Sequence, residues 1–156
     1  MSEYNFKTLE KEMSKNWRSM NLLRLLQRKN NGGKPYFLLE GPPYANAKPH
    51  VGHLRNVFYK DLNQRYQFMM GRNVLFTAGY DTHGLPIENI VEKKLGFKNK
   101  KDILKFGLKN FAKECKKLTS ESMNLWKKPY NLYGCWIGWD DEPYLTYNNS
   151  YLESGW

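Results

Sequence analysis

Two histidines, His50 and His53, lie three residues apart with Gly52 between them, directly after a proline-rich segment. Residues with this spacing are neighbours on a helix, so both imidazoles would lie in the first turn of a helix that starts near Val51. A helix start offers unpaired backbone N–H groups and the positive end of the helix dipole, which together can hold polyphosphate. Gly52 would let a flat base or a phosphate approach the backbone closely. The pattern predicts an anion-binding segment.

The same pattern also has a purely structural interpretation. A histidine at a helix start can simply cap the helix or lie satisfied in a crevice, and short motifs occur often by chance. The flanking sequence favours binding, because the apolar run from Tyr36 to Leu39 is typical of a buried strand that Gly41, Pro42 and Pro43 bring to an end. Beyond it, apolar residues recur with helical spacing at Val51, Leu54, Val57, Phe58, Leu62, Tyr66 and Met69.

A second short strand is predicted from Val74 to Ala78, after a turn at residues 71–73. Strand, helix and strand in this order form a right-handed crossover unit with parallel strands. The segments that follow Leu39 and Ala78 would then lie at the carboxyl ends of parallel strands, where open α/β sheets bind ligands. The expected fold class is α/β.

Two blocks of sequence carry a family resemblance. The first is Pro42-Pro43-Tyr44-Ala45-Asn46 followed by His50-Val51-Gly52-His53, and the second is Gly79-Tyr80-Asp81-Thr82-His83-Gly84-Leu85-Pro86-Ile87-Glu88. Together they resemble the class I aminoacyl-tRNA synthetases in the form typical of isoleucine–tRNA ligases, and the run Asp140-Asp141-Glu142-Pro143-Tyr144-Leu145-Thr146 is similar to a further run of that family. This chain departs from the family pattern in having Ala47 in place of Gly, and Ala78-Gly79-Tyr80-Asp81 in place of Pro-Gly-Trp-Asp.

The resemblance implies a fold and a reaction. The fold is the first half of a Rossmann-like, doubly wound parallel sheet with an amino-terminal helix and a helical insertion. In the reaction, the carboxylate of isoleucine attacks the α-phosphorus of ATP, which brings Mg²⁺ with it, and isoleucyl-adenylate forms. The acyl group then passes to the isoleucine tRNA. Such chemistry depends on alignment and charge stabilisation more than on a covalent side chain.

The resemblance also implies roles for single residues. His50 and His53 would be the catalytic pair, holding the ATP phosphates and steadying the developing charge. The full ATP-binding set would be Pro43, Tyr44, Asn46, His50, Gly52 and His53. The isoleucine side would be lined by Pro42, Pro43 and Tyr44, and Asp81 would pair with the α-ammonium group. Asp81 can instead cap the turn that follows it, and His83 and Glu88 remain open between ligand and packing roles. No residue is expected to hold a metal ion.

Charge and composition limit the class of protein. The formal charge of +10 suits ATP or a tRNA as partner, although the lysines between Lys93 and Lys117 first indicate a solvated helix face. No apolar run approaches the roughly 20 residues that cross a bilayer, and the first residues lack a secretory signal, so we expect a cytoplasmic protein without a membrane partner. Cys115 and Cys135 form no metal or disulfide pattern, and Cys115 is expected to be a buried thiol.

Further elements complete the expected organisation. One amphipathic helix is predicted from Phe6 to Arg28, so residues 1–33 form an amino-terminal helix and linker. Residues 34–156 form part of a synthetase catalytic domain, truncated before the editing insertion. The insertion is predicted as helices over 87–95 and 103–133, and Trp136 and Trp139 as core. Ser150 and Glu153 have capping-box spacing, which predicts a last helix.

Two functional hypotheses follow. In the first, the chain is part of an isoleucine–tRNA ligase. It would be inactive or weak by itself, because the second half of the sheet, the editing domain and the anticodon-binding region are absent. The strand at Tyr36–Leu39 would then be an exposed apolar edge that favours aggregation. In the second, the chain is a stand-alone module that binds ATP or RNA without ligase activity.

Overall fold

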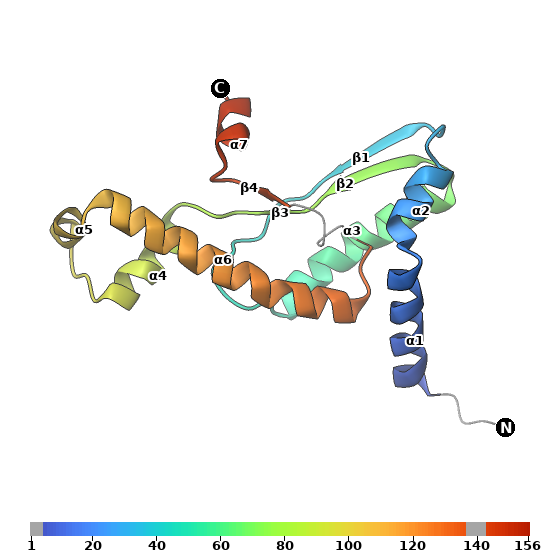
Figure 1. Cartoon of the computed structure of the whole chain (residues 1–156), viewed down its shortest axis with the longest axis horizontal. Helices are drawn as coiled ribbons and strands as arrows, with labels where there is room; N and C mark the ends of the chain where they lie inside the picture. Colours follow the sequence, from blue (N-terminus) through green and yellow to red (C-terminus); the bar gives the residue numbers. More distant parts are fainter. Residues whose placement is uncertain (1–4, 137–142) are drawn as a thin grey trace.

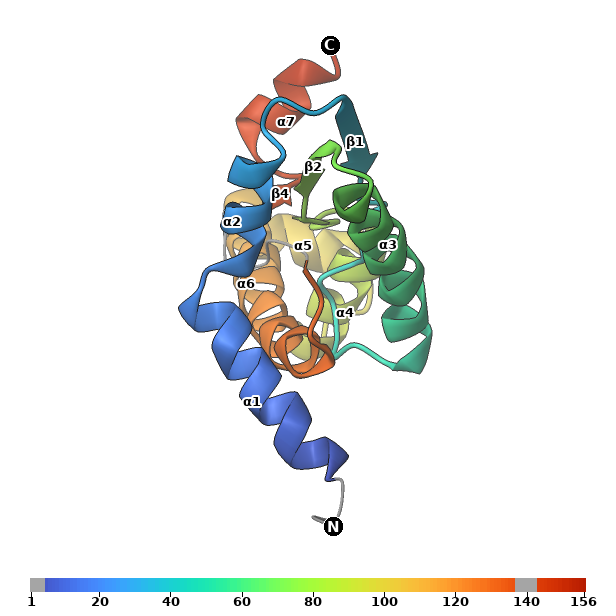
Figure 2. The same ribbon diagram turned by 90° about the vertical axis from the view of Figure 1, so that its right-hand side faces the viewer.

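The computed structural model describes residues 5–136 and 143–156, which fold into an α/β structure (Figure 1). The elements within these residues are α1 (Phe6–Ser19), α2 (Leu22–Lys29), β1 (Pro35–Leu39), α3 (Val51–Met69), β2 (Asn73–Thr77), β3 (Gly79–Tyr80), α4 (Leu85–Leu95), α5 (Lys100–Phe106), α6 (Leu108–Tyr133), β4 (Tyr144–Leu145) and α7 (Asn149–Ser154). In both ribbon views α7 projects from the upper side of the molecule and α1 from the lower side (Figures 1 and 2).

The described strands form two parallel pairs, β1 with β2 and β3 with β4. Phe37 is opposite Leu75 and Leu38 is opposite Phe76 in the first pair. Leu38 and Phe76 face the core, whereas Phe37 and Leu75 are each more than half exposed. The predicted strand–helix–strand order and the parallel pairing are confirmed, with α3 packed against β2. These residues thus build a two-stranded sheet with one covered face.

The core lies where α3, the strands and α6 meet. Its buried members are Ala45, Val57, Phe76, Ala78, Tyr80, Trp126 and Tyr130. Trp126 and Tyr130, on α6, pack against each other with ring centroids 5.6 Å apart, and Tyr80 meets the edge of Trp126 at 6.1 Å. Burial raises the pKa values of the Tyr80 and Tyr130 hydroxyls. The long helix α6 therefore anchors the strand ends to the rest of the chain.

The predicted amino-terminal helix is two helices. The chain breaks between α1 and α2 at Asn21, which adopts a left-handed conformation with φ of 47°. Asparagine tolerates this region better than most residues, and apolar spacing alone gave no sign of the break. Much of the apolar stripe of α1 is exposed, including Phe6 at 67%. The carboxyl-terminal end of α1 packs where Trp17 meets Trp136 edge-on, with ring centroids 5.8 Å apart.

Two further expectations about helices were wrong. The helix predicted over 103–133 is divided at Gly107, whose φ of 93° ends α5 and starts α6. The last helix does not use Ser150 as its cap, because Asn148 occupies that position and makes no side-chain capping hydrogen bond. Both corrections concern helix ends, which depend on one or two backbone angles and not on apolar periodicity.

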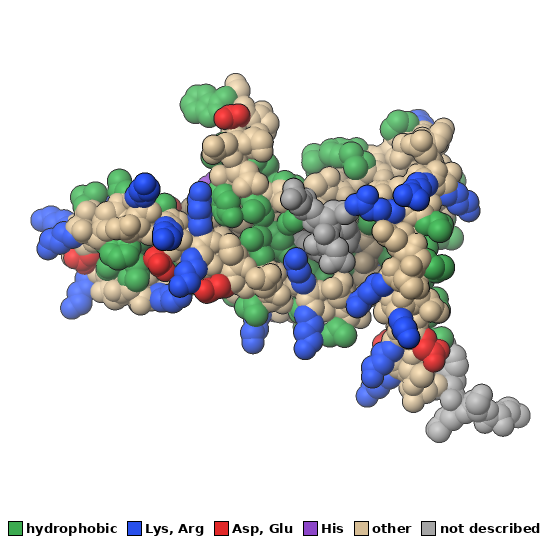
Figure 3. All heavy atoms as spheres, viewed as in Figure 1, with side chains coloured by type: hydrophobic (Ala, Val, Ile, Leu, Met, Phe, Trp, Pro, Cys, Tyr) green, Lys and Arg blue, Asp and Glu red, His purple; other side chains and the backbone are tan. Residues whose placement is uncertain are grey.

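The helical insertion forms a lysine-rich lobe. Helices α4 and α5 both pack against α6, and blue side chains gather over this lobe in the space-filling view (Figure 3). Cys115 is half-buried on α6, and burial together with nearby glutamates raises its thiol pKa to about 11. Trp136 is half-buried beneath the guanidinium of Arg65, 4.1 Å from its ring centroid, and Trp139 lies outside the described residues.

None of the helices in the described ranges has the length and apolar character needed to span a membrane.

Candidate nucleotide and amino-acid site

Backbone hydrogen bonds join the segment after β1 to the segment after β3. The Asp81 N–H donates to the Pro43 carbonyl at 2.9 Å, and the Ala45 N–H donates to the Asp81 carbonyl at 2.9 Å. Tyr44 and Asp81 thereby form a parallel bridge. The structure thus brings together three residues that the sequence assigned to the isoleucine side, Pro43, Tyr44 and Asp81. Pro42 precedes them and is half-buried.

Trp126 of α6 contacts the loop between this bridge and α3 from the core side. The indole Nε1 donates to the Ala47 carbonyl at 2.7 Å, and Trp126 itself is 1% exposed. The same indole packs against the imidazole of His53, with ring centroids 4.7 Å apart. Only the carbonyl of Ala47 takes part, so the methyl group that departs from the family glycine does not disturb this contact. Asn46 is half-buried in the same loop.

His50 and His53 form a reciprocal cap at the start of α3. The His50 Nδ1 accepts from the Gly52 N–H at 3.1 Å, and the His53 Nδ1 accepts from the His50 N–H at 3.2 Å. The two rings lie close together, with centroids 3.8 Å apart and planes tilted by 32°. The sequence posed capping and ligand binding as alternatives, but the cap occupies only the Nδ1 atoms and so does not exclude binding through Nε2. In a neutral imidazole whose Nδ1 accepts, Nε2 carries the proton, so each ring keeps one N–H donor.

The pKa of His53 favours the neutral imidazole that the cap requires. Partial burial, reinforced by the neighbouring His50 ring, lowers the pKa of His53 below its ordinary value of 6.5. At neutral pH its Nδ1 is therefore free to accept the hydrogen bond that caps α3. Gly52 is needed for the same cap, because a β-carbon there would lie 2.9 Å from Cε1 of His50. The glycine makes room for the histidine ring itself.

Asp81 presents its carboxylate next to Thr146 and His83. The Thr146 hydroxyl donates to the Asp81 Oδ1 at 3.2 Å, and the His83 Nδ1 lies 4.0 Å from the same oxygen. The Asp81 side chain is 25% exposed and that of His83 is 56% exposed. The carboxylate is therefore partly open to a ligand and held from the protein side by a hydroxyl.

A buried ion pair that the sequence analysis missed supports the loop. Glu40, only 4% exposed, pairs with Lys60 of α3, which also donates to the Gly41 carbonyl at 3.4 Å. The Tyr144 hydroxyl donates to the Glu40 carbonyl at 2.7 Å. Burial raises the pKa of the Glu40 carboxyl, while Lys60 opposes that shift. In the sequence, the only sign of this ion pair was a charged residue, Glu40, directly after the apolar run of β1.

The predicted residues form two groups that Trp126 connects. Pro43, Tyr44 and Asp81 form one group through the backbone bridge, and His50, Gly52 and His53 form the other through the helix cap. Trp126 contacts the ring of His53 in the second group, and on the other side it contacts the ring of Tyr80, the residue that precedes Asp81. Glu88 lies half-buried in the first turn of α4.

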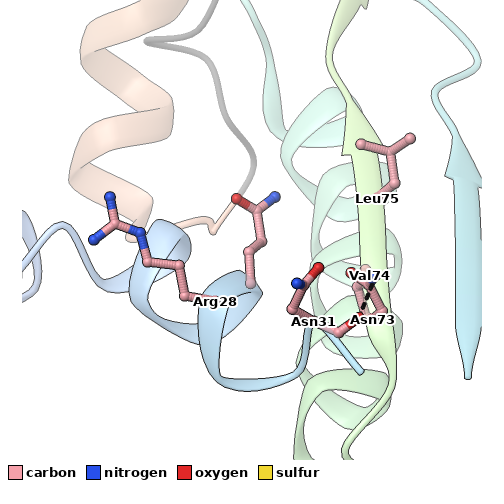
Figure 4. A pocket seen from close by; sticks show the side chains of 6 residues that line it. Arg28, Asn31, Asn73, Val74 and Leu75 are labelled. Carbon is pink, nitrogen blue, oxygen red and sulfur yellow. Dashed lines mark hydrogen bonds between the residues drawn. The ribbon is translucent and has the colours of Figure 1, made fainter. Parts of the chain in front are cut away.

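A separate hollow lies between α2 and β2 (Figure 4). Its lining consists of Gln27, Arg28, Asn31, Asn73, Val74 and Leu75. The Asn73 side chain donates to the Asn31 carbonyl at 3.2 Å across its floor. None of the residues predicted to bind ATP or isoleucine lines this hollow. Within the described ranges, no group of three or more His, Cys, Asp or Glu residues is placed to hold a metal ion.

Comparison with known proteins identifies the family of this chain. Residues 12–156 match the family model described as tRNA synthetases class I (I, L, M and V). The chain belongs to this family. It is 42% identical over 152 residues to the isoleucine–tRNA ligase of Clostridium novyi and 40% identical over 154 residues to that of Methanocella arvoryzae. These matches cover 97% and 99% of the chain but only 14% of each ligase.

A solved structure supports the fold. The chain is similar to the LeuRS of Agrobacterium radiobacter, whose crystal structure is a ternary LeuRS-tRNA-LeuAMS complex, with a TM-score of 0.68 and 24% identity. The match covers 96% of this class I synthetase chain and 16% of that LeuRS. Expectations of family and of α/β class are thus confirmed.

Proposed function

We propose that this chain is the part of an isoleucine–tRNA ligase that holds ATP and isoleucine for adenylate formation. The observation that carries the proposal is the Tyr44–Asp81 bridge, which places an acidic side chain beside the loop leading into the histidine helix. The identity of about 40% to isoleucine–tRNA ligases supports the choice of amino acid. Residues 34–156 would belong to the catalytic domain and residues 1–33 to an amino-terminal helical segment.

The phosphates of ATP would bind at the start of α3. Each imidazole there has its Nδ1 engaged in the helix cap, so the Nε2–H groups of His50 and His53 remain as donors to phosphate oxygens. Because both donors belong to one rigid cap, little reorganisation is needed as negative charge shifts to the leaving pyrophosphate. Mg²⁺ would arrive with ATP. Gly52, Asn46, Tyr44 and Pro43 would complete the nucleotide side.

Isoleucine would bind at the strand ends. Asp81 would pair with its α-ammonium group, and Pro42, Pro43 and Tyr44 would line its side chain. The substrate carboxylate oxygen then attacks the α-phosphorus, a new P–O bond forms, and the bond to pyrophosphate breaks. The isoleucine tRNA would take the acyl group in the following step. The expected sheet is the first half of a Rossmann-like, doubly wound arrangement, in which β1 and β2 are neighbouring parallel strands.

A chimera tests this function. The chain would replace the 152-residue stretch it matches in the Clostridium novyi ligase, and ATP–pyrophosphate exchange would be measured with isoleucine, valine and leucine. We expect exchange that depends on isoleucine and is much weaker with the other two. The unaltered ligase is the control. Absence of isoleucine-dependent exchange in a folded chimera that still binds ATP would contradict the proposal and favour a nucleotide-binding module.

A further inference from the structure

The hydroxyl of Thr146 is the centre of a buried polar cluster. Thr146 is 4% exposed and belongs to the segment that follows β4. Its Oγ1 lies within hydrogen-bond distance of four groups: the Thr82 N–H at 3.0 Å, the Thr82 hydroxyl at 3.2 Å, His83 Nδ1 at 2.7 Å and Asp81 Oδ1 at 3.2 Å. A hydroxyl has one proton and two lone pairs, so these contacts restrict one another.

The number of available protons fixes which group donates in each hydrogen bond of the cluster. The Asp81 carboxylate can only accept, so the Thr146 proton goes to its Oδ1. The Thr146 oxygen then accepts from the Thr82 N–H and, over the shortest distance, from His83. This assigns the proton of a neutral His83 to Nδ1. The Thr82 Oγ1 has a donor of its own, the Tyr147 N–H at 3.2 Å.

The two carboxylate oxygens of Asp81 differ in their contacts with the described residues. Oδ1 of Asp81 is held by Thr146, whereas no residue in the ranges 5–136 and 143–156 makes a hydrogen bond to Oδ2. Removing the hydroxyl would free the carboxylate to rotate about χ2, a broad torsion in aspartate. It would also leave His83, 4.0 Å away, free to turn its N–H toward Asp81. A substrate ammonium would then compete with His83 for the same charge.

We propose that Thr146 is a positioning residue that orients Asp81 for the amino-acid substrate. The inference rests on the proposed function, because it assigns the ligand of Asp81 to the α-ammonium of the amino acid. Thr146 reaches this position because β4 pairs with β3 and the Thr146 N–H donates to the Tyr80 carbonyl at 3.3 Å. Residues 65 apart in sequence thereby form one recognition unit.

The test uses the chimeric ligase and compares Thr146→Val with Thr146→Ser. Valine keeps the volume and removes the hydroxyl, whereas serine keeps the hydroxyl. We expect Thr146→Val to raise KM for isoleucine about tenfold, the usual scale for a lost hydrogen bond to a charged group, with KM for ATP unchanged. Thr146→Ser should restore most of the affinity for isoleucine.

A double-mutant cycle separates positioning from general stability. If Thr146 acts through Asp81, then Thr146→Val should change KM for isoleucine little in an Asp81→Asn background. Additive effects in that background, or equal rises of both KM values together with a lower melting temperature, would overturn the inference. The parent chimera's own exchange tests the ligase function, so failure there is distinct from failure of the Thr146 comparison.

Discussion

His50 and His53 each use one ring nitrogen to cap α3, and we propose that the other nitrogen binds the phosphates of ATP. The reciprocal cap at Gly52 N–H and His50 N–H positions both rings in the absence of a ligand. Preorganised donors of this kind lose little freedom on binding. In this proposal the spacing of the two histidines serves helix stability through Nδ1 and ATP binding through Nε2.

The lowered pKa of His53 predicts a pH effect on stability. Because the folded-state pKa lies below the ordinary 6.5, the unfolded chain binds more protons and the free energy of unfolding falls as the pH drops below about 6.5. In His53→Gln the glutamine can still reach back to the His50 N–H but does not titrate. Urea unfolding at pH 7.5 and pH 5.5 should show a smaller pH-dependent loss in the variant than in the parent. An equal loss in both chains would contradict this account.

At the scale of elements, α6 positions the loop that leads into α3. Trp126 fills the core and donates its indole N–H to the Ala47 carbonyl. Tyr80 and His53 both pack on the same indole. One side chain of the helical insertion thus sets the position of the loop, the strand end and the histidine pair.

Shortening this side chain should destabilise the fold. We expect Trp126→Phe to lower the free energy of unfolding by about 2 kcal/mol, since it leaves a small cavity and removes the donor to the Ala47 carbonyl. Trp17→Phe is the matched control, because Trp17 lies half-buried near the end of α1 and should cost about 0.5 kcal/mol. Urea unfolding of both variants measures the difference. Equal losses of unfolding free energy in the two variants would contradict a larger contribution of Trp126 to stability.

Much of this framework was predictable from the sequence. Apolar periodicity and the Gly-Pro-Pro stop predicted β1, α3 and β2. The rule that ligands bind at the carboxyl ends of parallel strands predicted one site for the segments that contain Tyr44 and Asp81, which the structure joins in a bridge. The break at Asn21 was not predictable, because apolar spacing continues across it while a single backbone angle changes. Thr146 was missed as a partner of Asp81, since a two-residue strand such as β4 has no periodicity to read.

At the scale of the whole molecule, one face of the β1–β2 sheet is open. Phe37, Leu39 and Leu75 share this face and are exposed by 55%, 69% and 54%. Among the described residues β1 pairs with a strand on one side only. The chain spans about 14% of the length of the two ligases compared with it. Exposed apolar faces and open strand edges both promote association.

The 156-residue chain should therefore self-associate when isolated. We expect size-exclusion chromatography with light scattering to show a concentration-dependent rise in mass, which Leu39→Lys reduces because it places a charge on the open face. Leu132→Lys is the control, since Leu132 is 75% exposed and belongs to α6 and not to a strand. Equal reduction by both variants would mean that association does not involve this face.

The central claim is that Asp81 recognises the amino acid beside a separate ATP-binding histidine pair. Its most direct test is ATP–pyrophosphate exchange by the chimeric ligase with Asp81→Asn, measured over ranges of isoleucine and of ATP. We predict a rise of tenfold or more in KM for isoleucine, because a neutral amide replaces the carboxylate, with little change in KM for ATP. An unchanged KM for isoleucine would contradict it.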